Sequence, residues 1–388
     1  MTSATPACAV RRLRLHRFRN YTESTAVFHP GLNIISGPNA QGKTNLLEAV
    51  ATLALTRSPR ASSSADLLQW GTEGCQIEAD VERPAGPTTV IARFEQGHDS
   101  SAISRRITVD GKPRAARGVL GLCPAVLFWP DDLQLVKGGP EGRRRFLDVL
   151  LSQVDARAAV HLMRYRRVVE QRNALLHTLR VHGGSAAALV GFTRELALHG
   201  SRVMVARQRL IQHLSPRAAD AMLELTSGAE SLTLQYRTHE SIPAAHEEQT
   251  EQHLLDVLDR LRTDELIRGM TLVGPHRDDI AVELSGKPAR YTASQGQQRS
   301  IVLACKIAEM HVLTQATGMS PVLLLDDVVS ELDGQRRRHL MSTLAAVPQR
   351  QVLITTTEQL SEAALFDSVH HFAVSAGTVS EVVRATTP

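Results

Sequence analysis

The chain has 388 residues, of which 43% are hydrophobic, and it carries 44 Lys and Arg against 40 Asp and Glu. This length and apolar fraction exclude a disordered or fibrous protein and predict more than one domain. The longest uncharged apolar stretch, residues 118–130, is too short to span a membrane, and no apolar segment typical of a secretory signal precedes the first arginines. The four cysteines show neither metal-ligand spacing nor a disulfide framework. We therefore expect a cytoplasmic protein without a membrane partner.

The first predicted elements surround a glycine-rich loop. Residues 11–19 alternate arginines with apolar side chains, which predicts a strand with one charged face. Residues 32–35 form a short β-favouring run, and apolar side chains at helical spacing follow from position 46. Between them stand Gly37-Pro38-Asn39-Ala40-Gln41-Gly42-Lys43-Thr44, the G-x-x-x-x-G-K-[ST] pattern of a phosphate-binding loop (P-loop).

The residue types of this loop fit the binding of a nucleoside triphosphate. Glycines allow backbone N–H groups to turn toward the phosphates, and the N-terminus of the following helix attracts negative charge. Lys43 is expected to reach the β- and γ-phosphates, and the Thr44 hydroxyl is expected to hold Mg²⁺. The pattern therefore predicts ATP and Mg²⁺ as cofactors.

Three segments after the P-loop predict an antiparallel, β-rich lobe. Residues 76–81, 88–94 and 103–109 have the composition of strands, and Asp110-Gly111 after the last of them predicts a tight hairpin turn.

About 250 residues separate Thr44 from the next motif, far more than a compact transporter-type ATPase needs. Residues 143–182 contain neither Gly nor Pro and space their apolar side chains at three- and four-residue intervals, which predicts a long helix. We expect a return helix over 192–215, a shorter helix over 217–226, a strand over 231–237 and a helix over 244–268. This insert is predicted to form a helical arm.

Charge is unevenly distributed along the insert. Residues 143–217 carry 14 Arg and 4 acidic residues, a net charge of +10, whereas residues 218–268 carry 4 Arg and 11 acidic residues, a net charge of −7. An arginine-lined arm is suited to the backbone of DNA, and its densest candidate contacts are Arg143, Arg144, Arg145, Arg164, Arg166 and Arg167. Alternatively, the acidic helices pack against the basic ones as an ion-paired bundle. The sequence leaves both possibilities open.

A further motif, Ser294-Gln295-Gly296-Gln297-Gln298, precedes a helix expected over 299–313. Polar side chains and a glycine at a helix N-terminus are suited to a γ-phosphate. The motif is similar to the L-S-G-G-Q signature of ABC-type ATPases, in which the signature of one subunit closes over the nucleotide of the other. We therefore assign Ser294, Gln295, Gly296 and Gln297 to a nucleotide site in trans and expect an ATP-dependent homodimer.

The last motif is the apolar run 321–325, which ends in Asp326-Asp327. Such a run predicts a central parallel strand that delivers acidic residues to the ligand-binding edge of a sheet. In this Walker B pattern, Asp326 is expected to bind Mg²⁺ and Asp327 to polarise the attacking water, with Lys43 as the other catalytic residue.

Together, the ordered motifs resemble the bacterial RecF family of recombination-repair ATPases, relatives of the SMC proteins, over nearly the whole chain. The resemblance rests on Arg19-Asn20-Tyr21, the P-loop with Asn45-Leu46-Leu47-Glu48-Ala49, residues 128–132, 136–138 and 143–148, Gly274-Pro275-His276-Arg277-Asp278-Asp279, residues 294–299, residues 325–333, and Thr355-Thr356-Thr357.

The resemblance implies an α/β fold, with a P-loop ABC-type ATPase head of mixed sheet and β-rich lobe and an inserted α-helical arm domain. Residues 1–136 and 268–388 would form the head, and residues 137–267 the arm. In the family, ATP brings two heads together around DNA, at linear duplexes and at gaps with single strands, and hydrolysis releases them. The family acts with the RecR and RecO partners and supports the SOS response.

Two features differ from the wider ABC pattern. Asp327 stands where most ABC ATPases place Glu, and Thr355-Thr356-Thr357 occupy the region of the transporter switch histidine. Because the shorter acid holds a general base farther from water, we expect a weak ATPase that acts as a switch. His276 and Arg277 are candidates either for a phosphate contact or for a structural role.

Other functions explain fewer of the motifs. Another SMC- or ABC-type ATPase acting on DNA fits nearly as well. A transporter-type subunit would need a short insert and a switch histidine, which this sequence lacks, and a small-molecule kinase leaves the signature and the arm unexplained.

Overall fold

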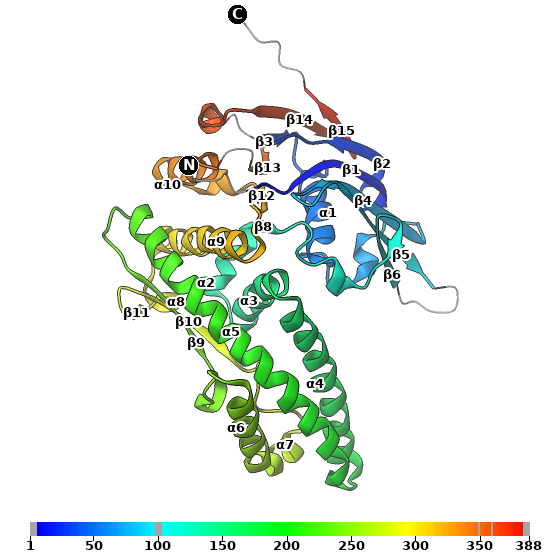
Figure 1. The fold of residues 1–388 in the computed structure, drawn as a ribbon, viewed down its shortest axis with the longest axis vertical. Helices are drawn as coiled ribbons and strands as arrows, with labels where there is room; N and C mark the ends of the chain where they lie inside the picture. The colour runs from blue at the N-terminus through cyan, green and yellow to red at the C-terminus, as the bar shows by residue number, and fades with distance from the viewer. Residues whose placement is uncertain (1–5, 98–102, 348–349, 358–359, 383–388) are drawn as a thin grey trace, which may run out of the picture. The chain divides into compact units, whose positions relative to one another are not determined.

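The computed structural model describes residues 6–97, 103–347, 350–357 and 360–382. These residues fall into two compact units, one formed by residues 1–132 with 309–388 and the other by residues 133–308 (Figure 1). The predicted boundaries between the ATPase head and the arm, at residues 136 and 268, are based on the ATP-binding motifs and stay a prediction. The compact units divide the chain differently, because residues 268–308 group with the helical segment. In the described ranges, no helix is both long and apolar enough to cross a membrane.

The first unit contains a six-stranded core sheet whose strands come from both ends of the chain. Its order is β15 (Thr378–Glu381), β14 (Val369–Ser375), β3 (Gly31–Ser36), β13 (Gln351–Thr356), β12 (Val322–Asp326) and β8 (Ala125–Phe128). All neighbours are parallel except β14 and β15. Every residue of β12 is buried, as expected for a parallel strand covered on both faces. The predicted strands at 32–35 and 321–325 are therefore confirmed, and both belong to this sheet.

A second, antiparallel sheet of the same unit forms the predicted β-rich lobe. Its order is β2 (Tyr21–Val27), β1 (Ala9–Phe18), β4 (Gly74–Glu82), β5 (Thr88–Gln96), β6 (Ile103–Val109) and β7 (Lys112–Pro113). Asp110 and Gly111 both have positive φ, 50° and 74°, which is the backbone that a two-residue hairpin between β6 and β7 requires. Helix α1 (Lys43–Leu55), which follows the P-loop, and α10 (Gly334–Ala345) also belong to this unit.

The second unit is mainly helical and contains a long antiparallel pair, α4 (Ala156–His182) and α5 (Leu189–Leu225) (Figure 1). Around them lie α2 (Gln134–Lys137), α3 (Pro140–Val154), α6 (Glu247–Arg260), α7 (Arg262–Arg268) and α8 (Ala289–Thr292). A small antiparallel sheet joins β9 (Leu232–Arg237), β10 (Asp279–Leu284) and β11 (Lys287–Pro288). Helix α9 (Gln295–Thr317) begins in this unit and ends in the first.

Three predicted helix boundaries in the arm are wrong. The single helix expected over 143–182 is interrupted at Asp155, whose extended backbone and carboxylate cap the N-terminus of α4. The helix expected over 244–268 is likewise divided, between α6 and α7, at Leu261. Conversely, the break expected at Pro216 does not occur, because α5 runs through it. Leu214 and Ala218, on either side, are fully buried, so packing maintains the helix at a residue that normally interrupts one.

Candidate nucleotide-binding site

The P-loop has a backbone conformation that depends on its glycines. Gly37 and Gly42 have φ of 149° and 114°, in the region that side chains disfavour. A Cβ atom on Gly37 would lie 2.3 Å from the carbonyl oxygen of Val374, and one on Gly42 would lie 2.6 Å from the Asn20 amide. Lys43 is the first residue of α1, and its Nζ donates to the carbonyls of Gly37 and Pro38 at 2.7 and 2.9 Å. The lysine is thereby held against the loop.

The segment between β1 and β2 supports the P-loop from outside. The Asn20 amide donates to the carbonyl of Gln41 at 2.9 Å, and the Tyr21 hydroxyl donates to the carbonyl of Gly42 at 2.8 Å. Burial raises the pKa of Tyr21, so its hydroxyl keeps the donated proton. Asn20 and Tyr21 are part of the family resemblance, and these hydrogen bonds are their physical role.

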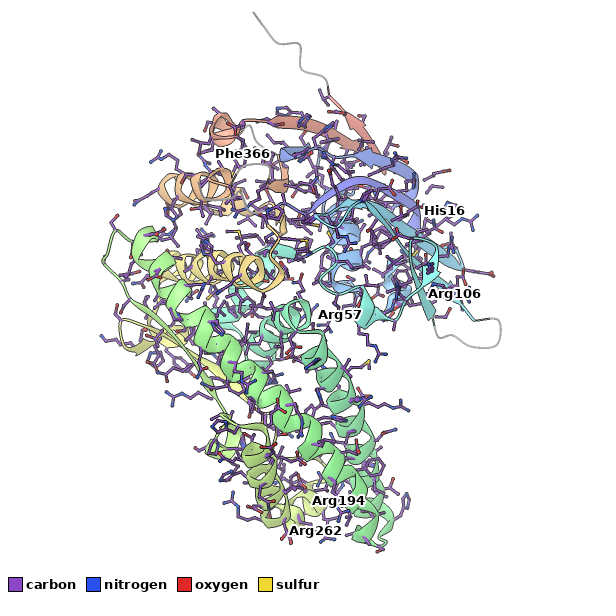
Figure 2. The ribbon with its side chains drawn as sticks, viewed as in Figure 1. His16, Arg57, Arg106, Arg194, Arg262 and Phe366 are labelled. Atoms are coloured by element: carbon purple, nitrogen blue, oxygen red, sulfur yellow. The ribbon has the colours of Figure 1, made fainter. Side chains whose placement is uncertain are left out.

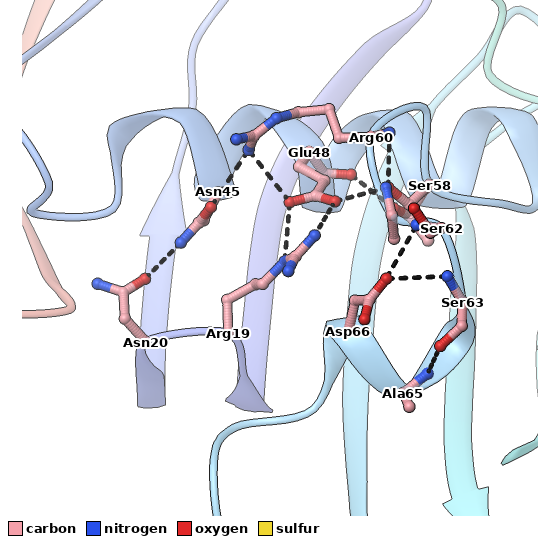
Figure 3. Close-up of polar contacts among 12 residues, drawn as sticks. Arg19, Asn20, Asn45, Glu48, Ser58, Arg60, Ser62, Ser63, Ala65 and Asp66 are labelled. Carbon is pink, nitrogen blue, oxygen red and sulfur yellow. Dashed lines mark hydrogen bonds and ion pairs between the residues drawn. The ribbon is translucent and has the colours of Figure 1, made fainter.

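A buried carboxylate, Glu48, fixes the helix that follows the loop. Its oxygens bind the Arg19 guanidinium at 2.7 and 3.1 Å, the Ser58 hydroxyl at 2.5 Å and Arg60 at 3.4 Å. Arg60 also donates to Asn45 at 3.4 Å, and Asn45 donates to Asn20 at 2.9 Å (Figure 3). No local sequence pattern predicted this Glu48 cluster, because its members come from three separate segments, residues 19–20, 45–48 and 58–60.

Asp326, at the end of β12, is the point where three predicted segments meet. Thr44 Oγ1 lies 2.9 Å from both carboxylate oxygens of Asp326, and Thr355 Oγ1 donates to Oδ1 at 2.7 Å. Burial raises the pKa of Asp326, although hydrogen bonds from Thr355 and Thr44 and the charge of Arg60 act in the opposite direction. A buried carboxylate beside two hydroxyls is an oxygen-donor set that suits Mg²⁺. The part played by Thr355, at the end of the adjacent strand β13, was not predicted.

Asp327 follows Asp326 directly but differs from it in exposure and in backbone conformation. Its side chain is exposed, and its backbone is left-handed, with φ 52° and ψ 21°. Its N–H donates to Thr355 Oγ1 at 3.0 Å, and its carbonyl accepts from the Ser330 hydroxyl at 2.7 Å. A non-glycine residue in this conformation is strained, and such strain is common at functional sites.

The signature segment forms a capped helix start in the second unit. The Gln297 side chain accepts from the Ser294 N–H at 2.7 Å, and Ser294 Oγ accepts from the Gln297 N–H at 3.3 Å, which is a capping box. Gln297 also donates to Glu230 at 2.6 Å, which anchors it to the arm. Ser294 and Gln295 are exposed, so the N-terminus of α9 is open to an anion.

The six predicted DNA-contacting arginines have two different environments. Arg143 is 6% exposed, and its guanidinium binds both carboxylate oxygens of Asp279 at 2.7 and 2.8 Å. Arg144 donates to the carbonyl of Asp278, and Arg166 forms an ion pair with Asp148, both at 2.8 Å. Arg145, Arg164 and Arg167 are exposed, and Arg166 is exposed in spite of its ion pair. Because Arg143, Arg144 and Arg166 bind Asp279, the carbonyl of Asp278 and Asp148, we leave these three out of the proposed interface.

Ion pairs also connect the basic and acidic halves of the arm. Arg172, on α4, binds Glu265, on α7, at 2.6 Å, and Arg202, on α5, binds Glu251, on α6. Near the connection between α4 and α5, Arg194 and Arg262 are exposed, and Arg262 donates to the carbonyl of Ala186 at 3.4 Å (Figure 2). Part of the positive charge is thus balanced by acidic residues within the bundle, which agrees with the alternative of an ion-paired bundle.

The motif from Gly274 to Asp279 lies in the second unit, and its polar residues bind neighbouring groups of that unit. His276 Nδ1 lies 2.5 Å from the Tyr165 hydroxyl, and both Arg277 nitrogens Nε and Nη2 donate to the carbonyl of Thr271. Asp278 accepts from the Tyr236 hydroxyl and from the His239 N–H. Burial lowers the pKa of His276 to about 4 and raises that of Asp278 to about 6. These contacts favour the structural role over the phosphate contact.

Comparison with known proteins agrees with the site geometry. A family model described as "RecF/RecN/SMC N terminal domain" matches residues 9–378. The DNA replication and repair protein RecF of Symbiobacterium thermophilum is 41% identical over 370 residues, covering 95% of this chain and 96% of that protein. The protein of the same name from Chloroflexus aurantiacus is 38% identical over 366 residues, covering 90% and 93%.

Solved structures give the same result for the fold. A structure described as the recombination mediator protein RecF with ATP, in the RecFOR pathway, superposes with a TM-score of 0.88 at 29% identity and covers 99% of this chain and 100% of its own. An Smc head domain from Pyrococcus furiosus has a TM-score of 0.55 at 14% identity over 97% and 96%, which bears on the fold alone. With the family model and the two relatives, these likenesses show that the chain belongs to the RecF family of DNA replication and repair proteins, within the RecF and SMC ATPases.

Proposed function

We propose that the chain is an ATP-dependent recombination mediator that binds ATP and Mg²⁺ at the P-loop, dimerises in that state and holds DNA between its two copies. The observation that carries the proposal is the convergence of Thr44 and Thr355 on the buried Asp326. The Thr44 hydroxyl and the Asp326 carboxylate would hold Mg²⁺, and Lys43 would bind the β- and γ-phosphates. Bound Mg²⁺ supplies charge stabilisation for the phosphates.

Dimerisation follows from the exposed signature. Ser294 and Gln295 lie at a helix N-terminus, where backbone N–H groups and the helix dipole favour a γ-phosphate. Together with Gly296 and Gln297, they would bind the nucleotide held by the P-loop of a second copy. ATP would then stabilise the dimer because each copy supplies half of the other's site.

Hydrolysis would end the DNA-bound state. Asp327 is the proposed general base, and its exposed position next to Asp326 leaves room for a water molecule. Because an aspartate is one methylene shorter than the usual glutamate, we propose slow turnover that times the release of DNA. The released state would leave RecR and RecO on the DNA, at gaps and stalled forks, and so promote repair and SOS induction.

The exposed arginines of the arm are the proposed DNA contacts. Arg145, Arg164 and Arg167 can bind phosphates of duplex or single-stranded DNA without reading its sequence. Binding is therefore expected to weaken steeply with salt.

Sedimentation velocity of the full chain with ATP, with ADP and with neither tests this proposal. ATP should convert the monomer to a dimer, and DNA should strengthen that dimer. Lys43→Met should abolish the ATP-driven dimer, whereas Ser294→Arg should abolish it while largely preserving ATP affinity, because the substitution blocks only the partner's site. Lys112→Met, at an exposed position on β7, is the matched control and should dimerise normally.

Two results would contradict the proposal. A wild-type chain that stays monomeric at saturating ATP and Mg²⁺ in the presence of DNA rules out the shared site. A Ser294→Arg variant that still dimerises rules out the signature in trans.

A further inference from the structure

Two histidines and a glutamate from three segments of the first unit come together on the core sheet. His29 lies between β2 and β3, His370 lies on β14, and Glu381 is the last residue of β15. Glu381 Oε1 is 3.2 Å from His29 Nε2 and 3.3 Å from His370 Nδ1, and the three ligand atoms all lie within 4.8 Å of one another. Among the residues that the structure describes, this is the one such group of three or more His, Cys, Asp and Glu side chains.

The distances are compatible with coordination, although His370 Nδ1 and Glu381 Oε1 also form a long hydrogen bond of 3.3 Å without an ion. A charge-assisted hydrogen bond to a carboxylate is about 2.7–2.9 Å long. Ligand atoms at the corners of a tetrahedron around Zn²⁺, with bonds of about 2.0–2.1 Å, are about 3.3–3.4 Å apart. His29 Nε2 is also buried and makes no hydrogen bond to any described residue, although it lies 3.2 Å from Glu381. Its lone pair or proton therefore has no aligned partner.

The two rings lie face to face, so one ring has to rotate about its side-chain torsions before both nitrogens direct their in-plane lone pairs at one ion. The imidazoles of His29 and His370 stack with centroids 3.8 Å apart and an interplanar angle of 12°. One nitrogen of each ring lies within 3.3 Å of the same Glu381 oxygen.

The backbone of His29 is fixed before any ion binds. Its N–H donates to Asn33 Oδ1 at 2.9 Å, and its carbonyl accepts from Asn33 Nδ2 at 2.8 Å and from Gln351 Nε2 at 3.2 Å. A ligand that is held in place loses little conformational freedom on binding.

His370 has the outer hydrogen bond that metal-binding histidines need. Its Nε2 lies 2.9 Å from the Ser368 hydroxyl. When Nε2–H donates to that oxygen, Nδ1 presents its lone pair toward Glu381. The three side chains are between 27% and 40% exposed, so an ion can reach them from solution.

We propose that His29, His370 and Glu381 form a binding site for a divalent transition-metal ion of the zinc type. Two nitrogens and one oxygen suit Zn²⁺, whereas Mg²⁺ and Ca²⁺ require more oxygen ligands. The fourth position is open to water. Because the ion joins the β14–β15 hairpin to the loop before β3, it stabilises the edge of the sheet whose strand β3 leads into the P-loop.

Zinc titration of the tag-free, nucleotide-free full chain against a competing chelator tests the site. We expect one tight site in the wild type, a loss of affinity of about 100-fold or more in His370→Ala and Glu381→Gln, and a loss of about tenfold in Ser368→Ala. Bound Co²⁺ should give the visible absorption of a tetrahedral complex. Zn²⁺ should raise the Tm of the wild type but not that of His370→Ala.

Two controls separate this site from other metal-binding groups. His16→Ala removes an exposed histidine on β1 and should leave zinc affinity unchanged (Figure 2). Asp326→Asn removes the proposed Mg²⁺ ligand and should also leave it unchanged, so failure of the nucleotide proposal would not affect the result. Equal zinc affinity in the wild type and Glu381→Gln would overturn the assignment. It would also be overturned if the wild type bound zinc no more tightly than His370→Ala. Glu381→Gln is nearly isosteric, so its result stands even if His370→Ala misfolds.

Discussion

Lys43 and Asp326 in the first unit and Arg143 and Arg172 in the second are all buried charged residues, yet their partners differ. Lys43 donates to backbone carbonyls and Asp326 accepts from hydroxyls, and neither has an opposite charge at ion-pair distance among the described residues. Arg143 and Arg172 each bind a carboxylate, at 2.7 and 2.6 Å.

The difference separates ligand sites from structural ion pairs. Burying a charge is costly unless an opposite charge or good hydrogen bonds compensate it. The proposed ATP and Mg²⁺ would balance the buried charges of the P-loop site, whereas the second unit balances the buried charges of Arg143 and Arg172 internally. A buried charge with neutral partners is therefore the better indication of a ligand site than the density of charge in the sequence.

Removal of a balanced arm charge should give the largest effect on stability. Arg172 is 2% exposed and Glu265 is fully buried, and Arg172 also donates to Thr271 at 2.9 Å. Arg172→Met leaves the Glu265 carboxylate buried without its partner and should lower the free energy of unfolding by about 3–5 kcal/mol. Urea denaturation of the full chain measures this loss.

A second substitution and a control identify the cause. Arg172→Met with Glu265→Leu removes both charges and should recover most of the lost stability. Arg157→Met, at an exposed position on the same helix, should change stability by less than about 0.5 kcal/mol. If the double variant is no more stable than Arg172→Met, the stranded carboxylate is not the cause.

The paired titration of His276 and Asp278 should give the next largest effect. His276, with a pKa lowered to about 4, binds fewer protons when folded than when unfolded, so its contribution to stability is lost as pH falls from about 6.5 toward 4. Asp278, with a pKa raised to about 6, binds more protons when folded, so its contribution is lost as pH rises from about 4 to 6. In the wild type the two slopes oppose each other.

Single substitutions should expose each slope. Relative to the wild type, His276→Gln should lose up to about 3 kcal/mol of stability between pH 4 and 6, because only the Asp278 slope remains. Asp278→Asn should show the reverse trend over the same interval. Urea denaturation at several pH values measures both, and stability curves parallel to that of the wild type would show that these groups do not titrate as a buried pair.

Local patterns predicted the nucleotide half of the molecule well. The strand, loop and helix around Lys43 depend on neighbouring residues; β3 extends one residue beyond the predicted strand at each end, and α1 begins three residues before the predicted helical spacing. The sequence placed Thr355 in the region of the transporter switch histidine. It did not predict the hydrogen bond from Thr355 to Asp326, because this bond joins two strands that only the folded sheet brings together.

The arm was predicted less completely because its interactions are distant in sequence. The partner of Arg143 lies 136 residues away and that of Arg172 lies 93 residues away, so charge counts could not distinguish them from exposed arginines. The helix start at Asp155 did have a local signal, an N-capping side chain, which the absence of Gly and Pro outweighed. Strands β14 and β15, which carry His370 and Glu381, were not predicted.

Neighbouring arginines on α4 provide the smallest and most selective test. Both Arg166 and Arg167 are exposed, but Arg166 is paired with Asp148 at 2.8 Å, whereas Arg167 has no ion pair within the described ranges. If the arm binds DNA as proposed, Arg167→Gln should weaken binding a few-fold and reduce the slope of log K against log salt by about 0.9, the value for one phosphate contact. Arg166→Gln should leave the slope unchanged, and its cost in stability should be small because Arg207 still binds Asp148. Fluorescence anisotropy with duplex DNA at several salt concentrations measures both slopes. Equal slopes for the two variants would mean that an internal ion pair does not remove an arginine from the interface, and the distinction between balanced and unbalanced charges would then fail for exposed residues.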